Sequence, residues 1–234
     1  MTRRRWIADD VSDNRAALIG DHARHLAQVL RAQVGQEFDI STGTEVRRGR
    51  ISGIHPDRVE FELGEVVAHL AESAITVAMS IFKFDRMEWA IEKCTELGVA
   101  RIVPVIAGRT EAHLAAAAAK RVERWGRIAR QAAEQSRRVS PADIFAPVKF
   151  DNLVAMAADA RIVLAEAEEE LLLKDAVGDA GSVLLALGPE GGWKPQELAA
   201  FRDAGWTAAS LGDTILRAET AVIAAVAVTR SILQ

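Results

Sequence analysis

The chain contains a single cysteine and no tyrosine among its 234 residues. One cysteine, Cys94, excludes an intramolecular disulfide and a zinc site built from several cysteines, and this scarcity is typical of proteins in a reducing compartment. Cys94 lies on the apolar side of a helical pattern, so we expect a core thiol rather than a nucleophile. The few aromatic residues exclude an extensive stacking surface for nucleobases, for which only Trp6 and Trp193 are candidates.

Long apolar runs are missing as well. The longest, residues 221–228, is too short to span a bilayer, and the basic start of the chain reaches acidic residues before any apolar segment typical of a secretory signal. No G-x-x-x-x-G-K-[ST] or G-x-G-x-x-G pattern occurs, which excludes the common phosphate-binding and dinucleotide-binding fingerprints. These absences predict a cytoplasmic protein with no membrane partner.

Charge is unevenly distributed along the chain. The net charge of −4 argues weakly against a nucleic-acid partner, yet residues 101–149 hold ten basic and four acidic side chains. Basic clusters also occur at residues 3–5 and 47–50, and arginine outnumbers lysine by 23 to 6. The forked donors of arginine suit phosphate groups, whereas a solvated helix face would show the same composition. Charge alone leaves both interpretations open.

Residues 1–70 predict a small β domain. Short β-like runs separated by glycines occupy most of it, at residues 37–41, 50–54 and 59–63. This pattern is typical of a barrel-like domain, interrupted by one helix at residues 21–32 with Asp21 as its N-cap. His22 and His25 are spaced for a shared metal, but no further ligand lies near them in the sequence, so we expect no metal and interpret His25 as packing or as an RNA contact.

Alternating strands and helices follow from residue 75 onward. Buried strands are predicted at residues 75–82, 102–106, 162–165 and 183–187, and helices at residues 85–97, 119–136, 195–204 and 218–233. Such alternation is typical of an α/β domain with a mainly parallel sheet. The last helix is apolar on most sides, which favours burial within the fold and against a second subunit.

The most informative segment is the turn G-P-E-G-G at residues 188–192. It directly follows the predicted strand at residues 183–187, and open α/β sheets bind ligands at the carboxyl ends of their strands. Glycine lets the backbone turn sharply and approach a flat ligand closely. A second segment, L-G-D-T-I-L-R-A-E-T-A at residues 211–221, follows shortly after. Together the two segments predict a ligand pocket suited to a nucleoside.

Six further segments resemble one protein family in the same order. They are residues 25–31 with Gly35, 83–89, 92–99, 109–110, 124–125 and 132–138, followed by the two glycine-containing segments. On these segments, over nearly the whole chain, the sequence resembles the 16S ribosomal RNA uridine-N3 methyltransferase family of the trefoil-knotted SPOUT class. Members of that family often have glycine at the positions of Phe84 and Arg137 and a basic residue at or beside Asp213, so these positions depart from the pattern.

The resemblance implies a PUA-like RNA-binding domain at residues 1–70 and a SPOUT trefoil-knot methyltransferase domain at residues 74–234. It further implies S-adenosylmethionine (S-adenosyl-L-methionine) as the methyl donor, 16S rRNA of the small ribosomal subunit as the substrate, and a homodimer whose interface completes the active site. Around the donor we expect Leu187, Gly188, Pro189, Glu190, Gly191, Gly192, Leu211, Gly212, Ile215, Leu216 and Arg217.

The expected chemistry is mainly positioning. Methyl transfer needs sulfur, methyl carbon and acceptor nitrogen in line, and the imide proton of uridine N3 must leave before or during attack. Arg217 is the first candidate to stabilise the developing uracil anion, and Glu190 or Glu219 could accept the proton or hold the imide edge. For Glu219, favourable charge in the first turn of the last helix is a slightly better explanation than catalysis, whereas for Glu190 the structural and catalytic explanations are about equal.

Basic side chains are expected to position a structured RNA through its phosphates and base edges. The candidates are Arg3, Arg4, Arg5, His25, Arg31, Arg86, Arg109, Arg137 and Arg138. Two other functions stay open. One is a knotted methyltransferase that modifies a different RNA site, such as a ribose 2′-hydroxyl, and the other is a non-catalytic RNA-binding assembly factor that retains a donor-like loop.

Overall fold

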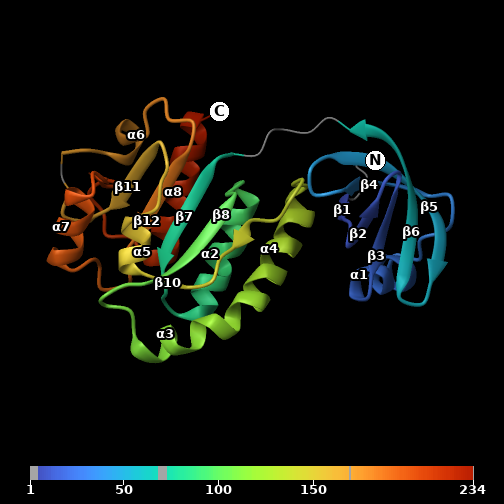
Figure 1. Cartoon of the computed structure of the whole chain (residues 1–234), viewed down its shortest axis with the longest axis horizontal. Coiled ribbons are helices and arrows are strands. Elements are labelled where there is room, and N and C mark those ends of the chain that lie inside the picture. The colour runs from blue at the N-terminus through green and yellow to red at the C-terminus, as the bar shows by residue number, and fades with distance from the viewer. Residues whose placement is uncertain (1–4, 68–72, 169, 234) are drawn as a thin grey trace. The chain divides into compact units, whose positions relative to one another are not determined.

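A computed structural model describes residues 5–67, 73–168 and 170–233 of the chain (Figure 1). The contacts divide it into two units, Met1–Ala71 with Ala133–Ser140, and Glu72–Ala132 with Pro141–Gln234. The first unit has one hydrophobic core, and the second has two, one on each face of its sheet.

Six strands form the sheet of the first unit. They are β1 (Arg5–Ile7), β2 (Asp10–Ser12), β3 (Arg15–Ile19), β4 (Glu37–Ser41), β5 (Val46–His55) and β6 (Arg58–Val67), paired in the order β1-β4-β5-β6-β3-β2. Only Ala8 and Asp9 separate the two end strands, and their amides donate to the carbonyls of Ser41 and Ala17 at 2.9 Å. The chain therefore passes directly from one edge of the sheet to the other. This curled sheet confirms the predicted barrel-like fold.

The core of the curled sheet is built from alternating side chains. Trp6, Leu18, Ile40 and Phe61 are at most 2% exposed. Gly49 lies among them at a register shift between β5 and β6, where an added Cβ would lie 2.3 Å from Cγ1 of Ile40. Glycine is required at this position because a side chain would collide with the core.

The helix predicted at residues 21–32 is present but is wound in two ways. α1 (Asp21–Arg24) continues directly into the π-helical turn η1 (His25–Val29). The prediction that Asp21 caps this helix is wrong, because the N-cap is Gly20 and the Asp21 carboxylate instead pairs with Arg24. The positive φ of 60° at Gly20 favours glycine at this entry to the helix.

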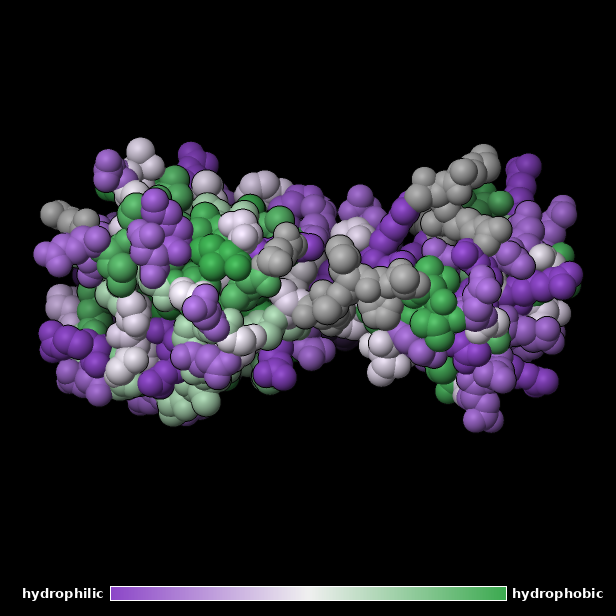
Figure 2. All heavy atoms as spheres, turned by 90° about the horizontal axis from the view of Figure 1, so that it is seen from above, coloured by the Kyte–Doolittle hydropathy of each residue, from purple (hydrophilic) through white to green (hydrophobic). Residues whose placement is uncertain are grey.

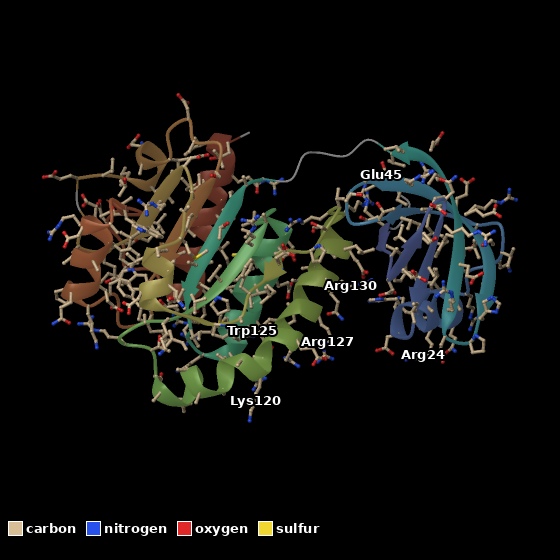
Figure 3. The ribbon with its side chains drawn as sticks, viewed as in Figure 1. Arg24, Glu45, Lys120, Trp125, Arg127 and Arg130 are labelled. Atoms are coloured by element: carbon tan, nitrogen blue, oxygen red, sulfur yellow. The ribbon has the colours of Figure 1, made fainter. Side chains whose placement is uncertain are left out.

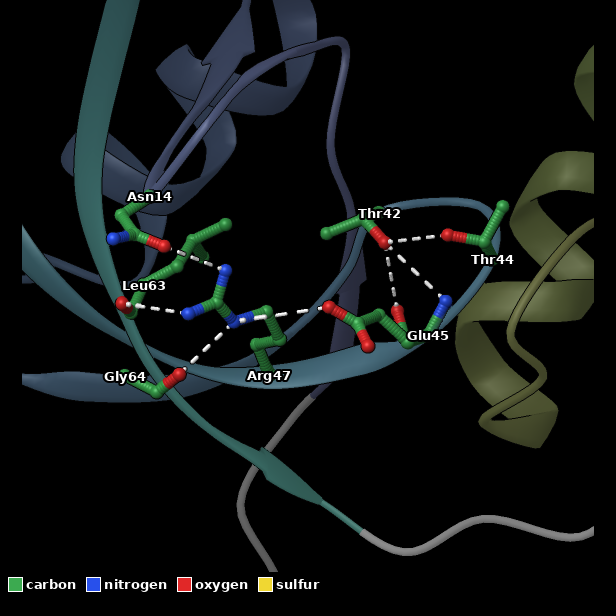
Figure 4. Close-up of polar contacts among 7 residues, drawn as sticks. All are labelled: Asn14, Thr42, Thr44, Glu45, Arg47, Leu63 and Gly64. Atoms are coloured by element: carbon green, nitrogen blue, oxygen red, sulfur yellow. Dashed lines mark hydrogen bonds and ion pairs between the residues drawn. The ribbon is translucent and has the colours of Figure 1, made fainter.

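Two of the three arginines at residues 47–50 serve the fold of the first unit. Arg47 donates to Oδ1 of Asn14 at 3.0 Å and to the carbonyls of Leu63 and Gly64 at 3.3 and 2.9 Å (Figure 4). Arg48 donates to Asp39 at 2.5 Å. These guanidinium groups tie neighbouring strands together, so this basic cluster is not simply a phosphate-binding surface.

A seven-stranded sheet forms the centre of the second unit. Its strands are β7 (Ile75–Ser80), β8 (Arg101–Ile106), β9 (Asp143–Ile144), β10 (Val148–Lys149), β11 (Ala160–Leu164), β12 (Val183–Leu187) and β13 (Thr207–Ala209). The order is β10-β8-β7-β12-β11-β13, with β9 also on β8, and every pair is parallel. The predicted α/β domain with a mainly parallel sheet is confirmed.

Helices cover both faces of this sheet (Figure 1). They are α2 (Phe84–Glu96), α3 (Ala112–Ala118), the 3₁₀ turn η2 (Ala119–Arg121), α4 (Val122–Ser136), α5 (Phe150–Val154), α6 (Leu173–Ala176), α7 (Pro195–Asp203) and α8 (Ala218–Leu233). Along β12, Val183 and Leu185 join the core on the α2 and α8 face, whereas Leu184 and Ala186 join the core on the α5 and α7 face. Burial on both faces explains why the strand is an unbroken apolar run.

Helix α4 presents two contrasting sides (Figure 3). Trp125 is fully buried and points toward the sheet, while Lys120, just before the helix, and Arg127 project away from it.

No helix in the described parts of the chain is both long and apolar enough to cross a membrane.

Candidate active site

Three neighbouring strand ends create the candidate site. In the register of the sheet, Leu164 at the end of β11 lies beside Leu187 of β12 on one side and Ala209 of β13 on the other. Because the strands are parallel, the loops that follow them emerge at the same edge of the sheet. These loops line a cavity of about 680 Å³.

The first wall of the cavity is the turn after β12. The amide of Gly192, whose φ is +70°, donates to the carbonyl of Pro189 at 2.7 Å and closes a tight bend. A Cβ on Gly188 would lie 3.3 Å from both the backbone nitrogen and the indole nitrogen of Trp193. The indole donates to the carbonyl of Leu164 at 3.1 Å, so Trp193 fastens this loop to the end of β11.

The second wall is the loop after β13. Gly212 has a φ of +110°, and no atom lies within 4 Å of the position of a Cβ there, so this glycine borders open space. Ile215 follows in the same wall and is 84% exposed, which is unusual for a large apolar side chain. An exposed apolar residue at a cavity is typical of a ligand-binding or subunit surface.

Arg109 and Glu197 connect the glycine turn to the loop after β8. Arg109, which follows β8, donates to the carbonyl of Gly191, and it lines the cavity. The buried Glu197 carboxylate accepts from the amide of Gly108 and from the amide of Lys194, each at 2.7 Å. This carboxylate both caps α7 and joins the loop after β8 to the end of the glycine turn, which compensates for the poor capping side chain of Lys194.

Two carboxylates and an arginine lie beside the cavity. Nη1 of Arg86 is 3.2 Å from Oε1 of Glu190, and its Nε is 3.7 Å from Oε1 of Glu219. Glu190 lines the cavity and keeps 39% of its side chain exposed. Glu219 lies in the first turn of α8 with only 9% of its side chain exposed.

The structure brings the predicted donor-binding residues together. All of them line the cavity except Arg217, which is exposed directly before α8. Within the described residues, no hydrogen bond or ion pair of the Arg217 side chain is present. The sequence prediction missed the wall formed by residues 164–168, which carry no glycine signal and lie at the end of β11, between β12 and β13.

The predicted RNA-binding residues lie in different surroundings. Arg3 and Arg4 fall outside the described residues. Arg5 is 8% exposed and donates to the carbonyl of Arg137, and burial lowers the pKa of its guanidinium, so its placement does not favour an RNA contact. His25 is half-buried, with its ring centroid 5.8 Å from that of Trp6.

Two of the predicted arginines terminate helices. Arg31 has a φ of 51° and Arg137 a φ of 59°, and both side chains are exposed. After α4, the amide of Arg138 donates to the carbonyl of Ala133 at 2.9 Å, which is the hydrogen bond of a Schellman helix end. Glycine is the usual residue at the left-handed position of that motif, and here an arginine occupies it.

Neither tryptophan proposed for stacking is available. Trp6 is 2% exposed in the core of the first unit, and Trp193 is 6% exposed and packs against Phe201. The stacking prediction therefore has no support at these two positions. Cys94 is buried in the core of the second unit as predicted, and burial raises the pKa of its thiol.

Comparison with known families identifies the family of the chain. Residues 70–230 match the family described as RNA methyltransferase domain, and residues 18–64 match the RNA methyltransferase PUA domain. The chain belongs to the RNA methyltransferase family. This match confirms both predicted parts of the fold of the chain, the PUA-like domain and the SPOUT-type domain.

Individual members are similar over most of their length. The ribosomal RNA small subunit methyltransferase E of Mycobacterium tuberculosis is 33% identical over 94% of this chain and 88% of its own length. The protein of the same name from Aquifex aeolicus is 32% identical over 86% of this chain and 88% of its own.

Solved structures of family members share the fold closely. Ribosomal RNA small subunit methyltransferase E from Neisseria gonorrhoeae, bound to S-adenosyl methionine, is 29% identical with a TM-score of 0.87 over 98% of each chain. A methyltransferase from Legionella pneumophila in complex with the same cofactor is 27% identical with a TM-score of 0.87 over 99% of this chain and 98% of its own.

Proposed function

We propose that this protein transfers a methyl group from S-adenosylmethionine to N3 of a specific uridine in the 16S rRNA of the small ribosomal subunit. One observation carries the proposal: in a member of the RNA methyltransferase family, two glycine-containing loops follow β12 and β13, the parallel strands on either side of β11, and line a single cavity. The similar structures with the bound donor support the choice of donor. The relatives named as small-subunit ribosomal RNA methyltransferases support the choice of RNA.

The cavity fits the proposed donor in size and chemistry. Its volume of about 680 Å³ lies within the range of small-molecule sites, roughly 300–1,000 Å³. Apolar Leu187, Ile215 and Leu216 can cover a flat adenine ring, while the turn at residues 188–192 brings backbone amides and carbonyls close to polar edges. The open space beside Gly212 leaves room for the ligand. When bound, S-adenosylmethionine supplies an electrophilic methyl group.

The acceptor chemistry is assigned to Arg217 and Glu190. Arg217 is exposed next to the cavity wall and has no competing partner within the described residues, so its guanidinium is available to stabilise negative charge on the uracil ring. Glu190 lines the cavity and can accept the imide proton or hold the imide edge. Glu219 is less suited to touch substrate because its Oε2 atom is buried.

RNA binding is assigned to the PUA-like domain and to exposed arginines of both units. Arg31 and Arg137 remain candidates for phosphate contacts because their side chains are exposed, and Arg138 is half-buried next to Arg137. Arg86 and Arg109 are engaged by the glycine turn, so their contribution to RNA binding is expected to be small.

We also propose that the protein acts as a homodimer in the cytoplasm. Trp89 on α2 and Ile232 on α8 are 46% and 37% exposed, and Ile215 is exposed at the cavity. Figure 2 shows hydrophobic side chains gathered in the middle of one face of the second unit. Apolar surface of this kind favours self-association. Sedimentation equilibrium should give twice the mass of one chain, and a concentration-independent monomer would refute the dimer.

The decisive experiment identifies the product. Purified protein is incubated with isotopically labelled S-adenosylmethionine and either small ribosomal subunits or free 16S rRNA from a strain that lacks the enzyme, and the nucleosides are analysed by mass spectrometry. We expect one N3-methyluridine per RNA. A ribose-methylated nucleoside would replace the proposed reaction with another RNA methylation. Absence of saturable donor binding by calorimetry would favour a non-catalytic assembly factor.

A further inference from the structure

One arginine joins two acidic residues that are far apart in the sequence. Arg86 lies in the first turn of α2, Glu190 lies 104 residues later in the turn after β12, and Glu219 lies in the first turn of α8. The guanidinium of Arg86 lies between the two carboxylates, with Nη1 directed to Glu190 at 3.2 Å and Nε to Glu219 at 3.7 Å.

The two carboxylates differ in their access to the cavity. Glu190 lines it, whereas the Oε2 atom of Glu219 is buried and has no hydrogen-bond partner within the described residues. A buried carboxylate requires a nearby cation, and within the described part of the chain the ion pair of Glu219 is made with Arg86. Glu219 therefore restrains Arg86 from the interior, and Arg86 restrains Glu190 at the cavity.

We propose that Arg86 and Glu219 are positioning residues that hold the Glu190 carboxylate toward the acceptor base. The proposal rests on the methyl-transfer function given above. A guanidinium has a planar fork of donors that reaches two carboxylates at once, whereas the ammonium of lysine is a compact charge on a flexible stem. Arg86 thereby acts through Glu190 instead of contacting RNA phosphate, and Glu219 acts through Arg86 instead of accepting a proton.

Single-turnover methylation at saturating donor tests this arrangement with the variants Arg86→Gln, Glu190→Gln and the double variant. We expect each single variant to slow methyl transfer at least tenfold and the double variant to be no slower than Glu190→Gln, because both changes remove the same positioned carboxylate. The dissociation constant of the donor should stay within twofold of wild type. Independent effects that multiply in the double variant would overturn the proposal.

Two further variants distinguish a positioning role from an effect on folding. Glu219→Gln keeps the side-chain volume without leaving a buried charge, and it should slow methyl transfer to the same extent as Arg86→Gln. Arg86→Lys should restore part of the rate, because the charge remains but the fork is lost. Wild-type rates in Glu219→Gln, or no recovery in Arg86→Lys compared with Arg86→Gln, would overturn the positioning role.

A matched control is available on α2, the helix that carries Arg86. Arg124 of α4 donates to both carboxylate oxygens of Glu88 of α2, at 2.6 and 2.8 Å, away from the cavity. Arg124→Gln removes a guanidinium of equal charge and should leave the rate within twofold of wild type. If Arg86→Gln behaves like Arg124→Gln, Arg86 has no positioning role.

A structural readout separates this proposal from the proposed function. In a crystal structure of Glu219→Gln, we expect the contact between Arg86 and Glu190 to lengthen beyond 4 Å. An unchanged contact would overturn the positioning role whatever the enzyme methylates. Failure of the proposed function would instead show in the wild type, as a product other than N3-methyluridine.

Discussion

Substitution of Gly212 by alanine offers a sharp test of the donor cavity. The residue has a φ of +110°, a conformation that alanine rarely adopts, and an added Cβ would meet no atom within 4 Å. The substitution therefore acts through backbone strain alone. Holding a residue in such a rarely populated conformation costs about 1–3 kcal/mol. The loop is exposed and can relax away from this conformation, which would displace the cavity wall formed by residues 211–216.

The backbone strain translates into a range of donor affinity. At about 1.4 kcal/mol for each tenfold change, relaxation of the loop should weaken S-adenosylmethionine binding by about 5- to 150-fold. Isothermal titration calorimetry measures this loss directly, and thermal unfolding reports any strain that the folded protein retains. We expect the melting temperature of Gly212→Ala to change little, because an exposed loop releases its strain by moving.

Gly178→Ala is the matched control. Gly178 also has a positive φ, +56°, with no atom within 4 Å of an added Cβ, but it does not line the cavity. This variant should lose at most about 1 kcal/mol of stability, because its exposed loop can also relax, and its donor affinity should not change. A donor affinity of Gly212→Ala within twofold of wild type, or an equal loss of affinity in Gly178→Ala, would refute the assignment of this loop to the donor site.

Three other outcomes are expected. Arg217→Ala should slow methyl transfer by about 100-fold, the scale for loss of one anion-stabilising donor, with an unchanged donor dissociation constant in calorimetry; an unaltered rate would exclude the proposed role. Arg137→Gly should raise the free energy of unfolding by about 1 kcal/mol in urea titrations, because glycine relieves the left-handed φ of 59°, and a loss of stability would show that this helix end is unstrained. Cys94 should resist alkylation at pH 8 in the native protein and react fully in urea, because burial raises the pKa of its thiol; rapid native labelling would contradict its placement in the core.

The pattern of apolar residues predicted those helices and strands whose structure depends mainly on their own residues. The strand at residues 183–187 and the helix at residues 218–233 have the predicted bounds, because an apolar run buried on two faces and a long apolar helix are both visible in the sequence. The short strands β9, β10 and β13 were not predicted. They have two or three residues each and form by pairing with neighbours that are distant in sequence.

The sequence predicted the part of the site that depends on the ends of the parallel strands. Parallel strands place the loops after β12 and β13 at one edge, so the two glycine-containing segments were expected to meet. The loop after β11 lines the same cavity, but its residues carry no glycine signal. Its role follows only from the position of β11 between β12 and β13, which the order of elements along the chain does not reveal.

The function of individual arginines was the least predictable feature, because it depends on tertiary partners. Arg47 donates to backbone carbonyls within a sheet, Arg86 forms ion pairs with two carboxylates distant in sequence, and Arg109 donates to the glycine turn. In the sequence these three residues contribute the same positive charge as Arg31 and Arg137, whose side chains are exposed at helix ends. A count of basic residues therefore overestimates the surface available to phosphate. Because the engaged arginines already pair with carboxylates or donate to carbonyls of the fold, the salt dependence of RNA binding should reflect the exposed helix-end arginines more than the total charge.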